Sequence, residues 1–168
     1  ELKGRYADTS RANFSQTMLI SCFSFTELAK RAAELMPETG GAMITLTFGG
    51  SMRVMPNYNV MGVAKAALEA SVRYLASDFG PRGIRVNAIS AGPIRTLAGS
   101  GIGEARAMFA FMQKHSPLRR GVTLDELGGS ALYLLSDLSG GVTGEIHYVD
   151  SGYNIVLMPR PDDLKTPD

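Results

Sequence analysis

Tyr58 and Lys65 are the two residues whose types and spacing best suggest chemistry, because a phenol and an ammonium can hold opposite ends of one bound molecule. Their separation of seven positions would turn a helix by about 700°, nearly two full turns. Both side chains would then share one face, with Cα atoms about 10.5 Å apart along the axis. A phenol with a pKa near ~10 is a good neutral hydrogen-bond donor at pH 7 and a poor base. From the spacing alone, a surface tyrosine and a solvated lysine are the more common interpretation.

The segment that must position this pair is predicted to be a helix over residues 57–79. It contains no proline, is rich in Ala, Leu and Lys, and ends at a Gly-Pro pair. A second long helix is predicted over residues 10–36, where apolar side chains recur at helical spacing. Shorter helices are expected over residues 104–114 and 123–135, the latter capped by Thr123.

Three short apolar segments alternate with these helices and are predicted to be strands: residues 42–48, 83–90 and 144–149. Strands separated by helices require crossover connections, so the fold class is predicted to be α/β with a parallel sheet covered on both faces. Three strands are few for such a sheet, which suggests that it is incomplete. We expect one domain over residues 1–158, followed by a polar tail over residues 159–168.

Composition excludes several classes of protein. The chain has 168 residues, 17 Lys and Arg against 16 Asp and Glu, and 45% apolar residues, which argues against disorder and against nucleic-acid binding through a basic field. Its single cysteine, Cys22, excludes an intrachain disulfide and suggests a reducing, cytoplasmic compartment. No apolar run reaches the ~20 residues that span a bilayer, and no signal peptide is recognised. Because the first residue is Glu1, we expect the chain to be part of a longer one.

Two stretches carry a resemblance to a known family. Residues 55–70 read MPNYNVMGVAKAALEA, and residues 85–98 read RVNAISAGPIRTLA. Both closely resemble bacterial enoyl-acyl carrier protein reductases of the FabI type, within the short-chain dehydrogenase/reductase superfamily, and the likeness extends over about residues 5–158. Other members of that superfamily carry a tyrosine four positions before the lysine, where this chain has Met61. The resemblance implies the carboxy-terminal part of a Rossmann-like, doubly wound parallel sheet.

The resemblance also implies an activity. Such enzymes pass a hydride from NADH to a trans-2-enoyl thioester on acyl carrier protein, in the last step of the type II fatty-acid elongation cycle. They are homotetramers built partly from the two long helices. Carried over to this sequence, the catalytic positions are Tyr58, Lys65 and Phe48, with Tyr58 donating a hydrogen bond to the thioester oxygen where negative charge develops. The coenzyme would meet Lys65, Gly92, Pro93, Ile94, Thr96, Leu97 and Ala98, and the acyl chain would meet Tyr58, Met61, Ala98 and Ile102.

Two departures from the family pattern qualify these expectations. Phe48 stands where FabI-type enzymes commonly have a second tyrosine, and a phenylalanine ring cannot donate a hydrogen bond. No Gly-x-Gly-x-x-Gly turn follows a strand in this sequence, so the pyrophosphate cradle of the family is absent from it. Two alternatives therefore stay open: a short-chain alcohol or ketone dehydrogenase, and a truncated chain that is inactive by itself.

The remaining candidates suggest ordinary structural roles. Cys22 is expected to be a buried packing thiol. His115 and His147 have no ligand-like spacing, so no metal site is predicted. Arg119 and Arg120 are expected to be solvated, although they could meet an acidic carrier protein. The apolar run 155–158 suggests a contact between subunits.

Overall fold

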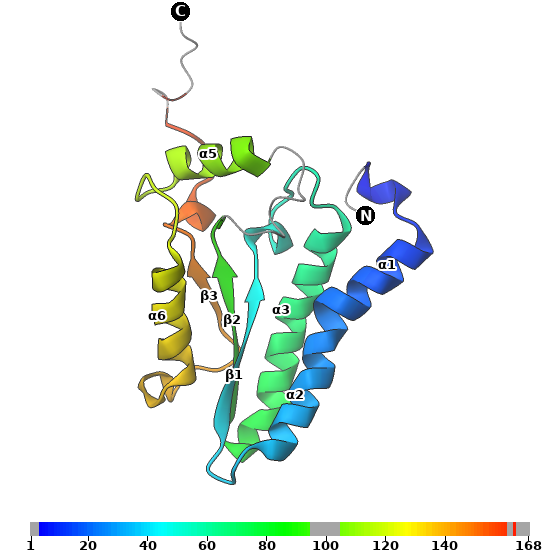
Figure 1. Cartoon of the computed structure of the whole chain (residues 1–168), viewed down its shortest axis with the longest axis vertical. Helices are drawn as coiled ribbons and strands as arrows, with labels where there is room; N and C mark the ends of the chain where they lie inside the picture. Colours follow the sequence, from blue (N-terminus) through cyan, green and yellow to red (C-terminus); the bar gives the residue numbers. More distant parts are fainter. Residues whose placement is uncertain (1–3, 95–104, 161–162, 164–168) are drawn as a thin grey trace, which may run out of the picture.

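A three-stranded parallel sheet with helices on both faces organises the molecule (Figure 1). The computed structural model describes residues 4–94, 105–160 and 163, with only the backbone of Ala105. The strands are β1 (Gly41–Thr47), β2 (Ile84–Ala91) and β3 (Ile146–Val149), in the order β1-β2-β3 with β2 central. Gly41 pairs with Ile84, and Ala88 pairs with Ile146. The predicted α/β class and parallel sheet are confirmed, and each strand begins or ends within two residues of the expected position.

One face of the sheet is covered by two long, neighbouring helical rods (Figure 1). The first consists of α1 (Arg11–Met18), a π-helical segment (Leu19–Phe23) and α2 (Ser24–Leu35), and the second is α3 (Val60–Phe79). The expected helix over residues 10–36 is confirmed over 11–35, with a π-helical turn in its middle, where Ser24 Oγ donates to the Ile20 carbonyl at 2.6 Å. Such side-chain bonds to a carbonyl one turn back compete with the regular ladder.

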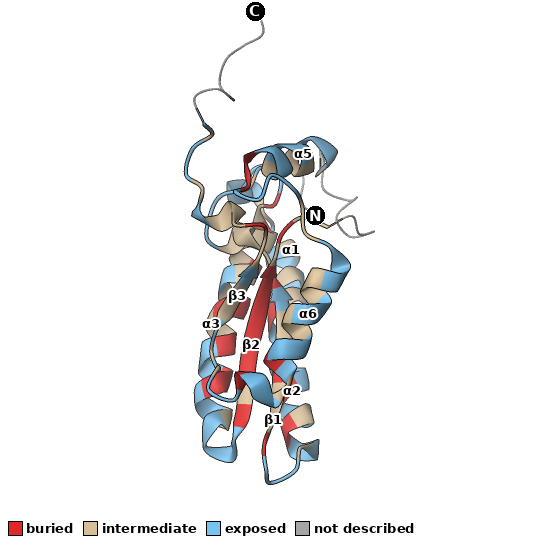
Figure 2. Ribbon diagram, turned by 90° about the vertical axis from the view of Figure 1, so that its left-hand side faces the viewer, coloured by how far each residue is buried: buried red, intermediate tan, exposed pale blue. Residues whose placement is uncertain are grey.

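The main core lies between these rods and the sheet. Among the described residues it contains nine buried apolar side chains, and β2 is buried along most of its length (Figure 2). The nine are Ala29, Ala33, Met43, Val72, Leu75, Ala76, Ile84, Val86 and Ala88. The opposite face carries α6 (Leu124–Leu135), which Thr123 caps as the sequence predicts; together with Glu126, Thr123 forms a complete capping box. The remaining α-helix, α5 (Ala105–His115), lies before α6 in the chain and crosses the carboxyl ends of the strands.

The short strand β3 is attached to β2 by side-chain hydrogen bonds from Asn87 and Arg85. Asn87, which is fully buried, donates to the Val142 carbonyl at 2.9 Å and accepts from the Glu145 amide at 3.0 Å. Arg85 donates to the carbonyls of Leu134, Ser136 and Val142. These bonds fix the end of α6 and the approach to β3, and they place the carboxyl ends of β2 and β3 side by side.

The predicted tail contacts basic side chains of the body through Asp163. Asp163 of the predicted tail lies within 3.7 Å of Lys114, 3.5 Å of His115 and 3.2 Å of Arg119. No helix among the described residues is both long and apolar enough to cross a membrane. Residues 95–104, which include the predicted positions Thr96, Leu97, Ala98 and Ile102, lie outside the described residues.

Candidate active site

Tyr58 lies in the turn that precedes α3, and its expected place on the helix is wrong. The helix begins at Val60, because Asn57 and Asn59 have positive φ values of 61° and 42°, which an α-helix cannot include. The Tyr58 side chain is 8% exposed. Its ring meets Phe48 edge to face, with centroids 5.3 Å apart and an interplanar angle of 72°. The structure therefore brings two of the predicted catalytic positions, Tyr58 and Phe48, into contact.

Two glycines make room for the Tyr58 ring. A Cβ on Gly50 would lie 2.6 Å from Cδ1 and 2.9 Å from Cε1 of Tyr58. A Cβ on Gly62, in the first turn of α3, would lie 2.8 Å from the carbonyl oxygen of Gly50. Gly50 is thus held between the Tyr58 ring on one side and the start of α3 on the other. No pattern in the sequence indicates this arrangement, because it depends on a contact between a loop and a turn.

We expect Gly62→Ala to lower the free energy of unfolding by about 1–3 kcal/mol, the usual cost of forcing a methyl group into a packed site. Gly128→Ala is the matched control, because Gly128 is an exposed residue inside α6 and a Cβ added there would meet nothing within 4 Å. That change should raise the free energy of unfolding by about 0.5–1 kcal/mol through helix propensity. Urea titration measures both, and equal effects of the two substitutions would contradict the close packing at Gly62.

The Tyr58 hydroxyl is a neutral group in this environment. Burial raises the pKa of Tyr58 to about 12, because the charged phenolate is poorly solvated there. Within the described part of the chain the hydroxyl has no hydrogen-bond partner. At pH 7 it therefore carries a proton that it can donate to a bound molecule.

Lys65 points from α3 toward the end of β1. Its Nζ donates to the Leu46 carbonyl at 2.8 Å. Burial lowers the pKa of Lys65, while the neighbouring Cys22 and Glu69 act in the opposite direction. An ammonium has three donors, so two remain after the bond to Leu46. Lys65 can therefore donate to hydroxyl groups of a ligand while it stays bonded to the Leu46 carbonyl.

The carboxyl end of β2 carries the predicted positions Gly92, Pro93 and Ile94. Gly92 is buried, its amide donates to the Val149 carbonyl at 2.7 Å, and a Cβ there would lie 2.9 Å from Cα of Asp150. Glycine is thus required at this position for packing against the end of β3. Pro93 and Ile94 are half-buried and follow it at the same edge of the sheet.

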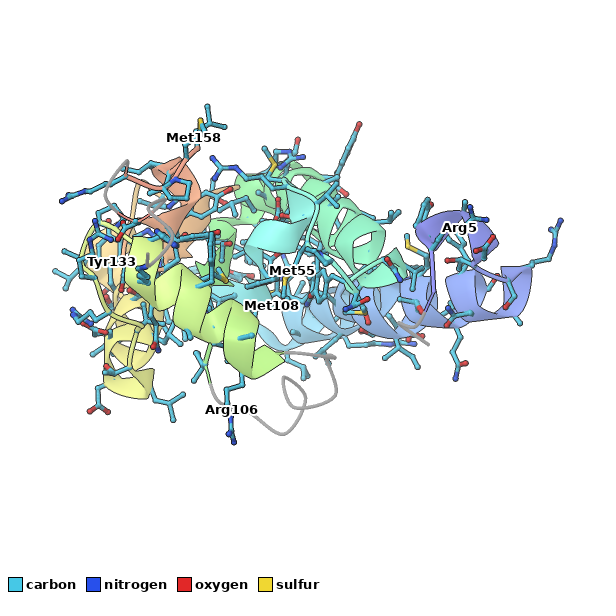
Figure 3. The ribbon with its side chains drawn as sticks, turned by 90° about the horizontal axis from the view of Figure 1, so that it is seen from above. Arg5, Met55, Arg106, Met108, Tyr133 and Met158 are labelled. Atoms are coloured by element: carbon cyan, nitrogen blue, oxygen red, sulfur yellow. The ribbon has the colours of Figure 1, made fainter. Side chains whose placement is uncertain are left out.

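A cavity of about 670 Å³ lies beside Phe48 and Gly50, the two residues that touch the Tyr58 ring. Its wall includes four methionines: Met52 and Met55 from the loop after β1, and Met108 and Met112 from α5. Met55 and Met108 are labelled in Figure 3, where α5 lies beside that loop. The α5 residues were not predicted from the sequence. A signal within this helix is a pair of methionines four residues apart on its apolar face, a pattern that is more often core packing.

Met61 is placed away from this cavity. It is half-buried, and its Sδ accepts a hydrogen bond from Ser21 Oγ at 3.4 Å. Tyr58, Lys65 and Met61 are not among the residues that line the cavity. A direct role of Met61 in acyl binding therefore stays a prediction.

The other side chains singled out by the sequence have structural partners. Cys22 is buried as expected, with Sγ 3.6 Å from Ser71 Oγ. Arg120 forms a two-point ion pair with Glu126, and Arg119 pairs with Asp163. In the described ranges no group of three or more His, Cys, Asp or Glu side chains could hold a metal ion.

Comparison with known proteins finds close relatives of this chain. A family model described as Enoyl-(Acyl carrier protein) reductase matches residues 1–154. Enoyl-acyl-carrier-protein reductase (NADH) 2 of Rhizobium meliloti is 77% identical over 168 residues, which is all of this chain and 62% of that protein. The chain thus spans about three fifths of the length of the curated relatives that it matches.

Two solved structures have the same arrangement of elements. The crystal structure of FabI from Candidatus Liberibacter asiaticus superposes with a TM-score of 0.91 and 66% identity, covering 95% of this chain and 62% of that one. The enoyl-acyl-carrier-protein reductase of Anaplasma phagocytophilum, solved in complex with NAD, gives a TM-score of 0.90 and 58% identity, covering 95% and 61%.

Proposed function

Since the chain belongs to the enoyl-acyl carrier protein reductase family, which the resemblance at residues 55–70 and 85–98 indicates, we propose that it reduces trans-2-enoyl thioesters with NADH. The substrate would be carried by acyl carrier protein, and the reaction would be the last step of fatty-acid elongation. The observation that supports this most is Tyr58, a buried and protonated phenol seated on Phe48 and Gly50, which also line an apolar cavity.

Tyr58 would stabilise charge on the substrate. As an enoyl thioester is reduced, negative charge develops on its carbonyl oxygen, and a donor fixed in advance at that oxygen lowers the barrier. The raised pKa of Tyr58 keeps its proton on Oη throughout the physiological range. Phe48 supplies no donor, so its contribution is the edge-to-face contact that holds the Tyr58 ring.

The described residues fit a nicotinamide coenzyme, which supplies a hydride when bound. Apart from its bond to Leu46, the Lys65 ammonium has two further donors with no hydrogen-bond partner among the described residues, and two donors suit the two hydroxyls of a ribose. The backbone of residues 92–94 follows the carboxyl end of β2, the edge at which doubly wound sheets bind ligands. Thr96, Leu97 and Ala98 remain predicted contacts outside the described residues. The preference for NADH follows from the names of the relatives.

The methionine-lined cavity would accept the acyl chain. Thioether side chains are apolar and adaptable, so they suit a flexible hydrocarbon. Its volume of about 670 Å³ lies within the usual range of small-molecule sites, about 300–1,000 Å³. Ala98 and Ile102 stay predicted members of this wall. Carrier-protein docking near Arg119 and Arg120 also stays a proposal, as does a cytoplasmic location.

One assay separates this function from the alternatives. The purified chain, and a version completed with the part of the Rhizobium relative that it does not cover, are mixed with NADH and crotonyl thioester, then with a simple ketone. Loss of NADH absorbance with the thioester supports an enoyl reductase. Turnover of the ketone alone would identify a ketone dehydrogenase. Turnover by the completed version alone would show that the chain is inactive by itself.

We also propose that the chain forms a homotetramer through its two long helical rods. Leu19, Ile20, Phe23 and Leu28 are between 51% and 66% exposed on the first rod, a set of large apolar side chains that a water-exposed surface rarely gathers. Phe23→Asp should therefore reduce the mass measured by sedimentation velocity, because it buries a charge in the contact. Leu138→Asp is the control, because Leu138 is exposed and follows α6, which covers the opposite face of the sheet from the rods. A wild-type chain that sediments as a monomer would contradict the proposal.

A further inference from the structure

Glu69 is a buried carboxylate with no place in the chemistry described so far. It lies on α3, one turn after Lys65, and is 4% exposed. Its Oε1 accepts hydrogen bonds from Thr47 Oγ1 at 2.7 Å and from Ser51 Oγ at 2.5 Å. A buried carboxylate is costly unless its hydrogen bonds are made, so both hydroxyls are needed where they are. Glu69 thereby ties the end of β1 and the following turn to α3.

The turn that Glu69 holds is the one on which Tyr58 rests. Ser51 ends a short 3-10 turn, Gly49–Ser51, whose middle residue is Gly50. Gly50 leaves no room for a methyl group between itself and the Tyr58 ring, so a shift of this turn would move the ring or open a gap beside it. The hydrogen bond between Ser51 and Glu69 therefore acts on the Tyr58 ring through one residue, Gly50.

Lys65 and Glu69 act on neighbouring points of the same strand end. Lys65 holds the carbonyl of Leu46, and Glu69 holds the hydroxyl of Thr47, the next residue. Two successive turns of α3 thus fix the segment that leads from β1 to Gly50. Helix α3, which carries Lys65, is therefore fixed relative to the turn that supports Tyr58.

From these contacts we propose that Glu69 is a positioning residue, which sets the place of the Tyr58 ring through Ser51 and Gly50. Its importance for catalysis rests on the proposed function, but the placement itself does not. Glu69 touches neither substrate nor coenzyme in this proposal. Its carboxylate acts only as an acceptor for two hydroxyl groups on the segment that follows β1.

The test follows the Tyr58 ring directly. The chain is labelled with 3-fluorotyrosine, and the Tyr58 resonance is assigned by its loss in Tyr58→Phe. Glu69→Ala removes both acceptor contacts, so the Tyr58 resonance should shift while those of Tyr6, Tyr74 and Tyr133 stay in place. Ser51→Ala removes one contact and should shift it in the same direction; this milder variant decides the question if Glu69→Ala does not fold. Glu69→Gln keeps an acceptor oxygen and should restore the wild-type resonance.

Val72→Ala is the matched control, because Val72 is fully buried on the same helix but belongs to the core against the sheet. It should lower the melting temperature and leave the Tyr58 resonance unchanged. An unmoved Tyr58 resonance in Ser51→Ala and Glu69→Ala, or an equal shift in Val72→Ala, would overturn the proposal.

An activity measurement separates this inference from the proposed function. In the completed enzyme Glu69→Ala should lower kcat roughly 10- to 100-fold, the effect of a misplaced catalytic group, with the KM for NADH unchanged. A shifted resonance in a protein that reduces no enoyl thioester would refute the function and keep the placement. A shifted resonance with normal kcat would refute the catalytic importance of Glu69.

Discussion

Tyr58→Phe is expected to lower kcat for enoyl thioester reduction at least roughly 100-fold, the usual cost of removing one donor from an oxyanion site, and to leave NADH affinity unchanged. The substitution keeps the ring and its contacts with Phe48 and Gly50, and removes only the hydroxyl. That hydroxyl has no partner within the described part of the chain, so its loss breaks no structural hydrogen bond there. Stopped-flow and steady-state assays of the completed chain measure kcat, and fluorescence titration measures NADH affinity.

Tyr74→Phe is the control for this prediction, because Tyr74 lies on α3 and is 75% exposed. It loses the same atom at a place far from the cavity, and its kcat should equal that of the wild type. A wild-type kcat in Tyr58→Phe as well would remove the phenol from the proposed chemistry.

The raised pKa of Tyr58 adds a measurement that needs no substrate. The phenol ionises near pH 10 in the unfolded chain and near pH 12 in the folded one, so its contribution to stability is complete below pH 10 and is lost as the pH rises to 12. The loss should approach about 3 kcal/mol, from two pKa units. Other tyrosines and lysines titrate in this range too. The difference between wild type and Tyr58→Phe therefore isolates the effect, and a difference that is constant with pH would contradict the burial of the phenol.

Patterns within one segment predicted the architecture well. Each strand was marked by a short apolar run between glycines, and α6 by its capping residue Thr123. These signals lie within one segment, so they can be recognised without knowing which other segments pack against it. The start of α3 was predicted wrongly, because the positive φ values of Asn57 and Asn59 are imposed by the packing of the turn that they enclose. Asparagine tolerates that conformation, but the residue type does not demand it.

Contacts between segments explain what the sequence did not predict in the site. A glutamate on a helix is usually solvated, and only the fold places Thr47 and Ser51 where they satisfy Glu69. The methionines of α5 face a cavity only because α5 crosses the carboxyl ends of the strands. Spacing along the chain identified Tyr58 and Lys65, whereas the residues that hold them in place come from elements whose relative positions are set by tertiary packing.

Lys65→Ala is expected to raise the dissociation constant of NADH roughly 10- to 100-fold, because hydrogen bonds from a charged donor are worth about 1.5–3 kcal/mol. The chain already uses one ammonium donor to hold the Leu46 carbonyl, which fixes the remaining two in direction. Leu46 is 58% exposed, so water can replace the lost bond and the fold should be nearly as stable as before. Calorimetric titration of NADH and a thermal melt of the same sample separate these two effects.

Lys30→Ala is the matched control for this change, since Lys30 is an exposed residue of α2 and should not alter NADH affinity. Lys65→Arg keeps the charge but replaces a compact ammonium with a planar fork, so it should restore only part of the affinity. Tyr58→Phe and Lys65→Ala together then test the division of labour between the two side chains. Weakened NADH binding in the tyrosine variant, with unchanged binding in the lysine variant, would show that the two roles are exchanged.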